Sequence, residues 1–314
     1  MKTILAIVPC YNEEESLPHL IAAFSAVRKQ LHNYQLDLLL VNDGSTDNTQ
    51  KLIKKFSDGN SYIYFRELAG NSGHQSALRA GLNIASGYSA AIMMDADMQH
   101  PPELIPSMLD AWEKGARIVQ MVRRDTRGDV GAIKYATSRG YYKVINAMSN
   151  LNLEYGASDF RLIDRLVTKT VAESREKNLF LRGYFSSLRV PKQTIEYKPN
   201  KRIAGVSKYT FRKMLDLAYQ GIIQFSEKPL QVAMIIGGFM AIISFAYAVV
   251  LTIGYFMGSF VVSGWTSLMV LMLFCFGINF ILIGFVGTYL TQALRLEKQR
   301  PEFIVANEKL PSKR

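Results

Sequence analysis

Two aspartates, Asp95 and Asp97, directly follow the apolar run Ala90–Met94. A short apolar run of this kind indicates a buried strand, so both carboxylates are expected at a strand end, where they can reach one site. A pair of carboxylates suits a hard divalent cation that keeps several waters and also binds the phosphate oxygens of a ligand. Gln99 can add a neutral oxygen. Such a pair also occurs in many surface turns, but the apolar run before it and the sequence QHPPE after it favour a metal–diphosphate site.

Two further polar turns each follow an apolar run. Ile4–Val8 leads into PCYNEEE, and Leu36–Val41 leads into NDGSTD. At the end of its strand Asp43 is placed to accept hydrogen bonds from a base or a ribose, and Tyr11 is placed to stack on a base. Asp47 is better explained as the cap of the following helix.

The segments around these turns alternate between strand and helix. Strands are expected over Ile4–Val8, Leu36–Val41, Tyr62–Phe65, Ala90–Met94, Arg117–Val122, Gly156–Ile163 and Arg189–Lys198. Helices are expected over Glu14–Leu31, Asn48–Phe56, Gln75–Ala85, Pro102–Lys114 and Lys134–Asn150. This alternation predicts an α/β fold with a mostly parallel, doubly wound sheet and helices on both faces. Ligands of such sheets bind beyond the carboxyl ends of the strands, where the three turns lie.

The C-terminal third has a different character, because no Lys, Arg, Asp or Glu occurs between Pro229 and Leu294. About 20 apolar residues cross the roughly 30 Å of a bilayer's hydrocarbon core, so this stretch predicts two transmembrane helices. Lys228 precedes the first and Arg295 follows the second, whereas the link between them is uncharged. The positive-inside rule therefore places both termini in the cytoplasm. The preceding Phe211–Phe225 suits a helix lying in the membrane interface, although an ordinary core helix has the same pattern.

Composition narrows the classes of partner. The chain has 314 residues and a net charge of +11, which lies outside the apolar segments. We expect the basic surface to face anionic lipid rather than nucleic acid, because no nucleic-acid-binding motif is present. The two cysteines, Cys10 and Cys275, fall in the α/β part and in the second apolar segment, so a disulfide between them is not expected.

Six motifs occur in a fixed order along the chain: PCYNEE, NDGSTD, NSGHQSALRAG, MDADMQHPPE, ASDFRLIDR and RIAGVSKY. Together they resemble the family 2 glycosyltransferases of GT-A fold. More narrowly, they resemble the polyprenyl-phosphate glycosyltransferases, which include bactoprenol glucosyltransferases and dolichol-phosphate mannose synthases, and the two apolar segments match the bactoprenol subgroup. Processive synthases of the same superfamily carry a QxxRW motif. Neither Trp112 nor Trp265 lies in that context, so polymer synthesis is disfavoured.

The resemblance implies a set of site residues. The donor nucleotide would be held by Pro9, Tyr11, Glu13 and Asp43. A Mg²⁺ or Mn²⁺ ion on the donor diphosphate would be held by Asp95, Asp97 and Gln99, so Asp95 also belongs to the donor site. Asp159, in ASDFRL, matches the proposed catalytic aspartate of the family. The chain departs from the pattern at Asn42, where many members have aspartate, which puts any role of that acid in doubt.

An anionic lipid phosphate beside an anionic diphosphate requires cations and hydroxyl groups. Arginine fits a phosphate with two parallel hydrogen bonds, whereas lysine acts as a point charge. The candidates for the acceptor phosphate are Arg123, Lys134, Ser138, Arg202, Ser207 and Lys208. Each of them could equally be a solvated surface residue.

The expected reaction is a metal-dependent, inverting transfer of a sugar from a nucleotide to undecaprenyl phosphate or another polyprenyl phosphate. The resemblance favours UDP-glucose as the donor. UDP-galactose, UDP-GlcNAc, GDP-mannose and an amino-arabinose donor stay open, because selectivity rests on a few pocket contacts. The alternative is a membrane-anchored, non-catalytic protein that retains a nucleotide-sugar site, an idea motivated by Asn42.

The expected organisation has four parts. A cytosolic catalytic domain spans 1–210, an interfacial amphipathic helix 211–228, two transmembrane helices 229–294, and a cytosolic tail 295–314. We expect a multi-pass protein of the inner (cytoplasmic) membrane, and a loosely ordered polar tail after Pro301. Gly254 and Gly258 form a GxxxG pattern in the first span, which would suit packing between subunits of a homo-oligomer.

Overall fold

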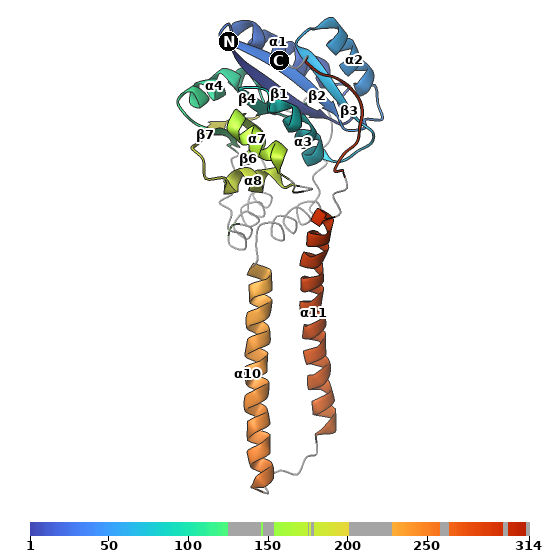
Figure 1. The fold of residues 1–314 in the computed structure, drawn as a ribbon, viewed down its shortest axis with the longest axis vertical. Helices are drawn as coiled ribbons and strands as arrows, with labels where there is room; N and C mark the ends of the chain where they lie inside the picture. The colour runs from blue at the N-terminus through green and yellow to red at the C-terminus, as the bar shows by residue number, and fades with distance from the viewer. Residues whose placement is uncertain are drawn as a thin grey trace.

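An α/β head stands at one end of two long helices in the computed structural model of this protein (Figure 1). The structure describes residues 1–124, 146, 154–174, 176, 179–200, 228–257, 264–297 and 301–311. The strands of the head are β1 (Lys2–Cys10), β2 (Tyr34–Asn42), β3 (Ile63–Leu68), β4 (Ala90–Met93), β5 (Ile118–Arg123), β6 (Ala157–Asp164), β7 (Lys192–Tyr197) and β8 (Val305–Lys309). Its helices are α1 (Leu17–Gln30), α2 (Thr49–Gly59), α3 (His74–Ala85), η1 (Pro102–Leu104), α4 (Ile105–Glu113), α7 (Arg165–Glu173) and α8 (Leu181–Ser187).

The described strands form one sheet in the order β7-β5-β6-β4-β1-β2-β3-β8. Parallel pairs join β1 to β2 and β4, β2 to β3, and β5 to β7, whereas β6 and β8 run antiparallel to their neighbours. The predicted α/β class with a mostly parallel sheet is therefore confirmed. Every strand expected from the apolar runs is present, with ends that differ by a few residues.

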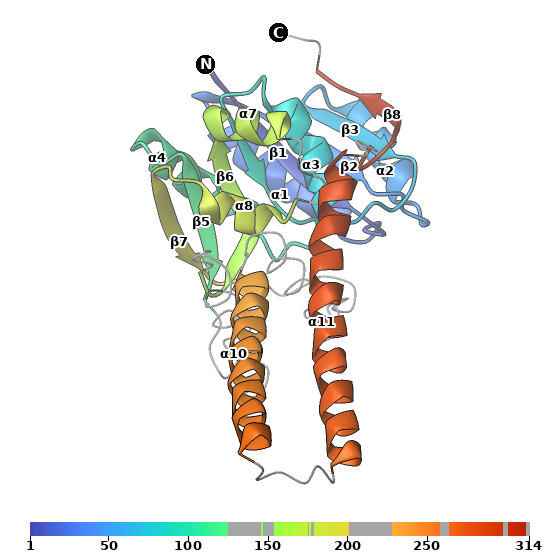
Figure 2. The ribbon, with the colours of Figure 1, turned by 60° about the horizontal axis from the view of Figure 1, so that its bottom comes forward.

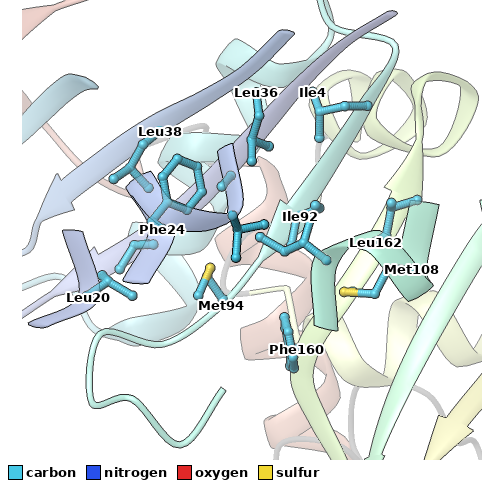
Figure 3. Close-up of a cluster of buried hydrophobic side chains, with 14 of the residues drawn as sticks. Ile4, Leu20, Phe24, Leu36, Leu38, Ile92, Met94, Met108, Phe160 and Leu162 are labelled. Atoms are coloured by element: carbon cyan, nitrogen blue, oxygen red, sulfur yellow. The ribbon is translucent and has the colours of Figure 1, made fainter. Parts of the chain in front are cut away.

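Both faces of the sheet are buried, which explains why its central strands are continuous apolar runs rather than alternating ones. In β1, Ile4 and Val8 face the layer of α1, α2 and α4, whereas Leu5 and Ile7 face the layer of α3, α7 and α8. Figure 3 shows the first layer, where Phe24 of α1 packs among side chains of the central strands. This double packing holds the carboxyl ends of β1, β2 and β4 side by side.

The helices α10 (Lys228–Phe256) and α11 (Trp265–Glu297) run side by side away from the head (Figures 1 and 2). Their most apolar windows, Leu230–Tyr247 and Phe274–Thr291, have mean hydropathies of 1.9 and 1.8, and only 6% and 0% of these windows is buried. Apolar helices buried in a soluble core would show the opposite. Both helices are therefore long and apolar enough to cross a membrane.

The expectation of a loosely ordered tail is wrong. Residues Val305–Lys309 form β8, which pairs antiparallel with β3 at the edge of the sheet (Figure 2). The backbone N–H of Ala69 also donates to the carbonyl of Ile304 at 2.8 Å. The polar sequence VANEK gives no sign of this, because an edge strand gains its stability from the hydrogen bonds that β3 offers.

Several expectations lie outside the described residues. They are the helices over Lys134–Asn150 (apart from Asn146) and Phe211–Phe225, the acceptor candidates Lys134, Ser138, Arg202, Ser207 and Lys208, and Gly258 of the GxxxG pattern. The domain boundaries and the homo-oligomer likewise stay predictions.

Candidate active site

The loops after β1 and β2 are joined into one rim at the carboxyl end of the sheet. The backbone N–H of Asn12 donates to Ser45 Oγ at 3.0 Å, and the N–H of Thr46 donates to Asn12 Oδ1 at 2.8 Å. Asn12 adopts the left-handed conformation with φ of 55°, which asparagine tolerates better than most residues. The two motifs recognised separately in the sequence thus form a single surface.

The three donor candidates of the first motif lie on this rim. Pro9 is buried at the end of β1, and Tyr11 is half-buried just beyond it. The carboxylate of Glu13 accepts a hydrogen bond from Ser16 Oγ at 2.5 Å, while its backbone N–H donates to Thr49 Oγ1 at 2.8 Å. Glu13 is therefore held from both the α1 and the α2 side.

Asp43 fastens a third loop to the rim. It is 3% exposed, and its two carboxylate oxygens accept hydrogen bonds from the backbone N–H groups of Ser72 at 2.7 Å and Gly73 at 3.0 Å. Burial raises the pKa of Asp43, although these two hydrogen bonds oppose the rise. A ligand that Asp43 binds must therefore share a carboxylate already engaged by the loop before α3.

Gly44 allows that loop to approach. Its φ is 67°, and a Cβ at this position would lie 2.6 Å from the carbonyl carbon of Gly70. We expect Gly44→Ala to lower the free energy of unfolding by roughly 2 kcal/mol, because it adds backbone strain and a backbone clash. Thermal unfolding of the full-length protein measures this. Gly59→Ala is the control, because a Cβ there meets nothing within 4 Å; equal stability of the two variants would contradict the prediction.

Asn42 has a structural explanation. Its side-chain Nδ2 donates to Gln50 Oε1 at 2.8 Å, and its Oδ1 accepts from Ser45 Oγ at 2.6 Å. An aspartate could not donate the first of these bonds. The departure from the family pattern is therefore matched by Gln50, and it gives no reason to regard the site as inactive.

The second carboxylate site lies beyond β4. Asp97 is 8% exposed, and its Oδ1 accepts from the backbone N–H of Gln99 at 3.1 Å. Met98 between them has φ of 64°, a left-handed conformation that is costly for a residue with a long side chain. Strain of this kind persists only where the surrounding structure imposes it, and it is frequent at functional sites.

His100 stabilises the turn that carries Asp95 and Asp97. Its Nδ1 accepts a hydrogen bond from the backbone N–H of Asp95 at 2.9 Å, and its ring stacks on Phe160 with centroids 5.0 Å apart. An Nδ1 that accepts this bond leaves the proton of the neutral ring on Nε2. His100 therefore orients Asp95 through the backbone.

The residues of this turn fit a divalent cation. Asp95 Oδ1 is buried and accepts no hydrogen bond from the described part of the chain. Within that same part no group of three or more His, Cys, Asp or Glu side chains is arranged to hold a metal by itself. Mg²⁺ and similar ions need only one or two carboxylates when waters and substrate phosphates supply the other ligands. Asp95, Asp97 and the amide oxygen of Gln99 are such a partial set.

Asp159, on β6, lies at the centre of a cluster of cations. It is 2% exposed, and Arg182 of α8 donates to both of its oxygens, from Nε and Nη2, at 2.9 Å each. His74 Nε2 lies 3.4 Å from Asp159 Oδ2 and 3.5 Å from Asp95 Oδ1, so it bridges the two carboxylates. Arg161 Nη2 lies 3.7 Å from Asp159 Oδ1. The cluster joins the predicted catalytic residue to the predicted metal site.

Burial would raise the pKa of Asp159, but the charge of Arg182 and the hydrogen bonds from His74 and Arg182 hold that pKa well below its usual range. For His74, burial lowers the pKa, yet the hydrogen bond to Asp159 and the charge of Asp95 raise it overall. Because 39% of the His74 side chain is exposed, the loss of hydration is limited and the carboxylates prevail.

The depressed pKa of Asp159 leads to a prediction about how the stability of the fold depends on pH. Its ionised form stabilises the fold above the unfolded carboxyl pKa of about 3.9, and this contribution is lost as the pH falls through the lower, folded value. We therefore expect the stability advantage of wild type over Asp159→Asn to be largest near pH 5. It should shrink below about pH 4 as Asp159 is protonated, and it should also shrink as the pH rises above about 6.5, because Asp159 raises the pKa of His74 and the charge of His74 is then lost. Denaturation at a series of pH values measures it. A difference that does not change between pH 5 and 3, or that grows between pH 5 and 8, would contradict the prediction.

Residues 5–171 match the sequence model of Glycosyl transferase family 2, which is more than half of the chain. The chain is a family 2 glycosyltransferase. The resemblance drawn from the six motifs is thereby confirmed.

Two relatives extend the similarity of this glycosyltransferase over its whole length. A bactoprenol glucosyl transferase of Shigella phage SfV is 36% identical over 98% of this chain and 99% of its own. A prophage bactoprenol glucosyl transferase homolog of Escherichia coli K12 is 34% identical over the same shares. Both matches include the region of α10 and α11. Among solved structures, a mannosyl-3-phosphoglycerate synthase from Rubrobacter xylanophilus has a TM-score of 0.47 at 16% identity, covering 71% of this chain and 72% of that one.

Of the acceptor candidates of the glycosyltransferase, the structure describes Arg123. It ends β5, and its backbone N–H donates to the carbonyl of Gly156 at 2.9 Å. Burial raises the pKa of Tyr197, and the nearby charges of Asp95, Arg123 and Asp97 also act on that hydroxyl. On the neighbouring strand β7, the register partner of Arg123 is Tyr197.

The set of site residues implied by the resemblance includes neither His74 nor Arg182. His74 stands in the NSGHQSALRAG motif, directly after a glycine with φ of 93°, and that glycine–helix junction was the available signal. Arg182 lies in the apolar stretch LFLRGYF, where a lone cation is unusual, but nothing nearby in the sequence indicates its partner.

Proposed function

We propose that this glycosyltransferase transfers a sugar, with UDP-glucose as the favoured donor, to undecaprenyl phosphate or a similar polyprenyl phosphate at the cytoplasmic face of the membrane. The supporting observation is the full-length similarity to bactoprenol glucosyl transferases, which includes the two exposed apolar helices. An acceptor with a polyprenyl tail is dissolved in lipid. Helices that cross the bilayer would keep the catalytic head at the surface where its phosphate emerges.

The acceptor chemistry agrees with the state of Asp159. A phosphate monoester has a second pKa near 6 and is already an anion at neutral pH, so the nucleophile needs little help from a general base. Asp159 is a poor base, because its pKa is depressed and both oxygens are bound by Arg182. We therefore assign Asp159 the role of holding Arg182 and His74 in place around the reacting groups.

The donor chemistry agrees with the rim formed by the loops after β1 and β2 and with the turn that carries Asp95, Asp97 and Gln99. Pro9, Tyr11, Glu13 and Asp43 would line the nucleotide site, and Asp95, Asp97 and Gln99 would hold Mg²⁺ or Mn²⁺. Such an ion, when bound, would offset the negative charge that grows on the departing diphosphate. His74 Nε2 lies 3.5 Å from Asp95 Oδ1, beside the proposed ion site. A single displacement at the anomeric carbon would invert its configuration.

The membrane arrangement is part of the same proposal. Lys228 begins α10 and Arg295 lies near the end of α11, and by the positive-inside rule these charges support a cytoplasmic location for the helix ends next to the head. The candidate residues for the acceptor phosphate stay Arg123, Lys134, Ser138, Arg202, Ser207 and Lys208.

The test is a donor screen of the full-length protein in detergent. Undecaprenyl phosphate is offered with UDP-glucose, UDP-galactose, UDP-GlcNAc or GDP-mannose in turn, and the product is detected by mass spectrometry. We expect an undecaprenyl phosphate that carries one hexose, formed fastest from UDP-glucose and with inverted configuration by NMR. Undecaprenol, which lacks the phosphate, is the matched control and should give no product. The absence of lipid product with every donor would refute the proposal.

A further inference from the structure

Arg79 of α3 joins three segments that are far apart in the sequence. Its side chain is 9% exposed, and Nη1 donates to Glu302 Oε2 at 3.0 Å. Nη1 also donates to the carbonyl of Glu176, and Nη2 donates to the carbonyl of Ser174 at 2.5 Å. One buried cation thus connects α3, the chain between α7 and α8, and the chain that follows α11.

Glu302 is brought to this position by the C-terminal segment. Its side chain is 7% exposed, and its second oxygen, Oε1, accepts a hydrogen bond from Ser76 Oγ at 3.0 Å. Phe303 packs against the core layer of α3, α7 and α8, and β8 then pairs with β3. Figure 2 shows this segment beside the edge of the sheet, close to the end of α11 that meets the head.

The elements that Arg79 holds are the ones that surround Asp159. The first residue of α3 is His74, and the second, Gln75, places Nε2 3.5 Å from Asp159 Oδ2. Gln75 Oε1 also accepts the backbone N–H of Leu181 at 3.2 Å, at the start of α8. The next residue, Arg182, makes the paired hydrogen bonds to Asp159. Arg79 therefore links α3, which carries His74, to the chain that precedes α8, which carries Arg182.

We propose that Glu302 and Arg79 are positioning residues for the glycosyltransferase reaction, and that the chain returning from the membrane completes the active site. Glu302 neutralises Arg79 and binds Ser76. Arg79 in turn holds the carbonyls that precede α8, so that His74 and Arg182 stay on Asp159. Neither Glu302 nor Arg79 needs to touch the substrate. The turnover measurement below rests on the proposed acceptor, whereas the exchange measurement does not.

The experiment compares full-length Glu302→Ala, Glu302→Gln and Glu308→Gln with wild type in detergent. Glu308 is the matched control: it lies in the same C-terminal segment, but it pairs with Arg66 and its side chain is 37% exposed. Hydrogen–deuterium exchange with mass spectrometry follows the backbone amides of 174–187 and of the first turn of α3. We expect Glu302→Ala to accelerate exchange there by about tenfold or more, with Glu302→Gln intermediate because its amide oxygen still accepts, and with β1 and α1 unchanged.

The same variants are tested for transfer from UDP-glucose to undecaprenyl phosphate. We expect kcat to fall about tenfold in Glu302→Ala. The KM for UDP-glucose should stay within about twofold of the wild-type value, because the substitution does not touch the rim of the donor site. Glu308→Gln should match wild type in both measurements. Unchanged exchange at 174–187, or faster exchange with wild-type kcat, would overturn the proposal. If wild type itself makes no lipid product, the proposed acceptor falls, and the exchange result alone decides the positioning role.

Discussion

Replacing Asp97 with asparagine is expected to lower kcat/KM for sugar transfer by about 10²- to 10³-fold, which corresponds to roughly 3–4 kcal/mol of transition-state stabilisation. The change removes one negative charge from the metal-site pair but keeps the shape of the side chain. The amide oxygen of asparagine can still accept the 3.1 Å hydrogen bond from Gln99 that shapes the turn. Initial rates at increasing Mg²⁺ and Mn²⁺ concentrations measure the effect, and higher metal concentration should recover part of the loss.

The control for Asp97→Asn is Asp110→Asn, which makes the same chemical change at an exposed position of α4. It should leave the rate within about twofold, as surface substitutions usually do. Removing divalent metal from wild type with a chelator should lower activity at least as much as Asp97→Asn does. A full rate in the variant, or in the chelated wild type, would refute the assignment of Asp95, Asp97 and Gln99 as metal ligands.

The fold of the head could be predicted largely because its central strands are buried on both faces. β1 contains the unbroken apolar run Ile4–Val8 and β2 the run Leu38–Val41, and each strand ends in a polar turn. The runs therefore locate the strands, and the turns locate the edge that carries the site. Asp95 and Asp97 were identifiable for the same reason. Their chemistry is local, since both lie on one turn directly after one strand.

The contacts that organise the site were not predictable, because they join distant segments. Asp43 was expected to bind a ligand, yet its oxygens also hold the backbone of Ser72 and Gly73. Such a contact depends on the packing of β2 against the loop before α3, and no period or motif of either segment reveals it. The apolar pattern that identifies a strand does not show which other element that strand contacts.

The C-terminal segment shows the same limit more sharply. β8 has no apolar run, and all five of its residues are exposed. Its place in the sheet depends on an open edge of β3 and on Glu302 reaching Arg79, a partner 223 residues earlier in the chain. A polar sequence near a terminus predicts disorder on composition alone. Here specific hydrogen bonds and ion pairs supply what the composition lacks.

Replacing Arg182 with alanine is expected to lower the free energy of unfolding by about 3 kcal/mol and to reduce turnover by at least about 10²-fold. Asp159 would remain nearly inaccessible to water without the two 2.9 Å hydrogen bonds that neutralise it. The loss is placed at the lower end of the usual range for breaking a buried pair, because His74 and Arg161 still lie within 4 Å of that carboxylate. Thermal unfolding in detergent and initial rates measure the two effects.

The double variant Arg182→Ala/Asp159→Asn separates stability from catalysis. Removing both charges leaves no unpaired carboxylate, so most of the lost stability should return, whereas turnover should stay as low as in Arg182→Ala. Arg117→Ala is the matched control, since it breaks a 2.8 Å ion pair with Asp164 elsewhere on β6. Asp164 keeps hydrogen bonds from Trp112 and Leu166, so this control should cost less stability and leave kcat unchanged. If turnover returned together with stability in the double variant, Arg182 and Asp159 would only support the fold, and the cation cluster would have no part in the transfer.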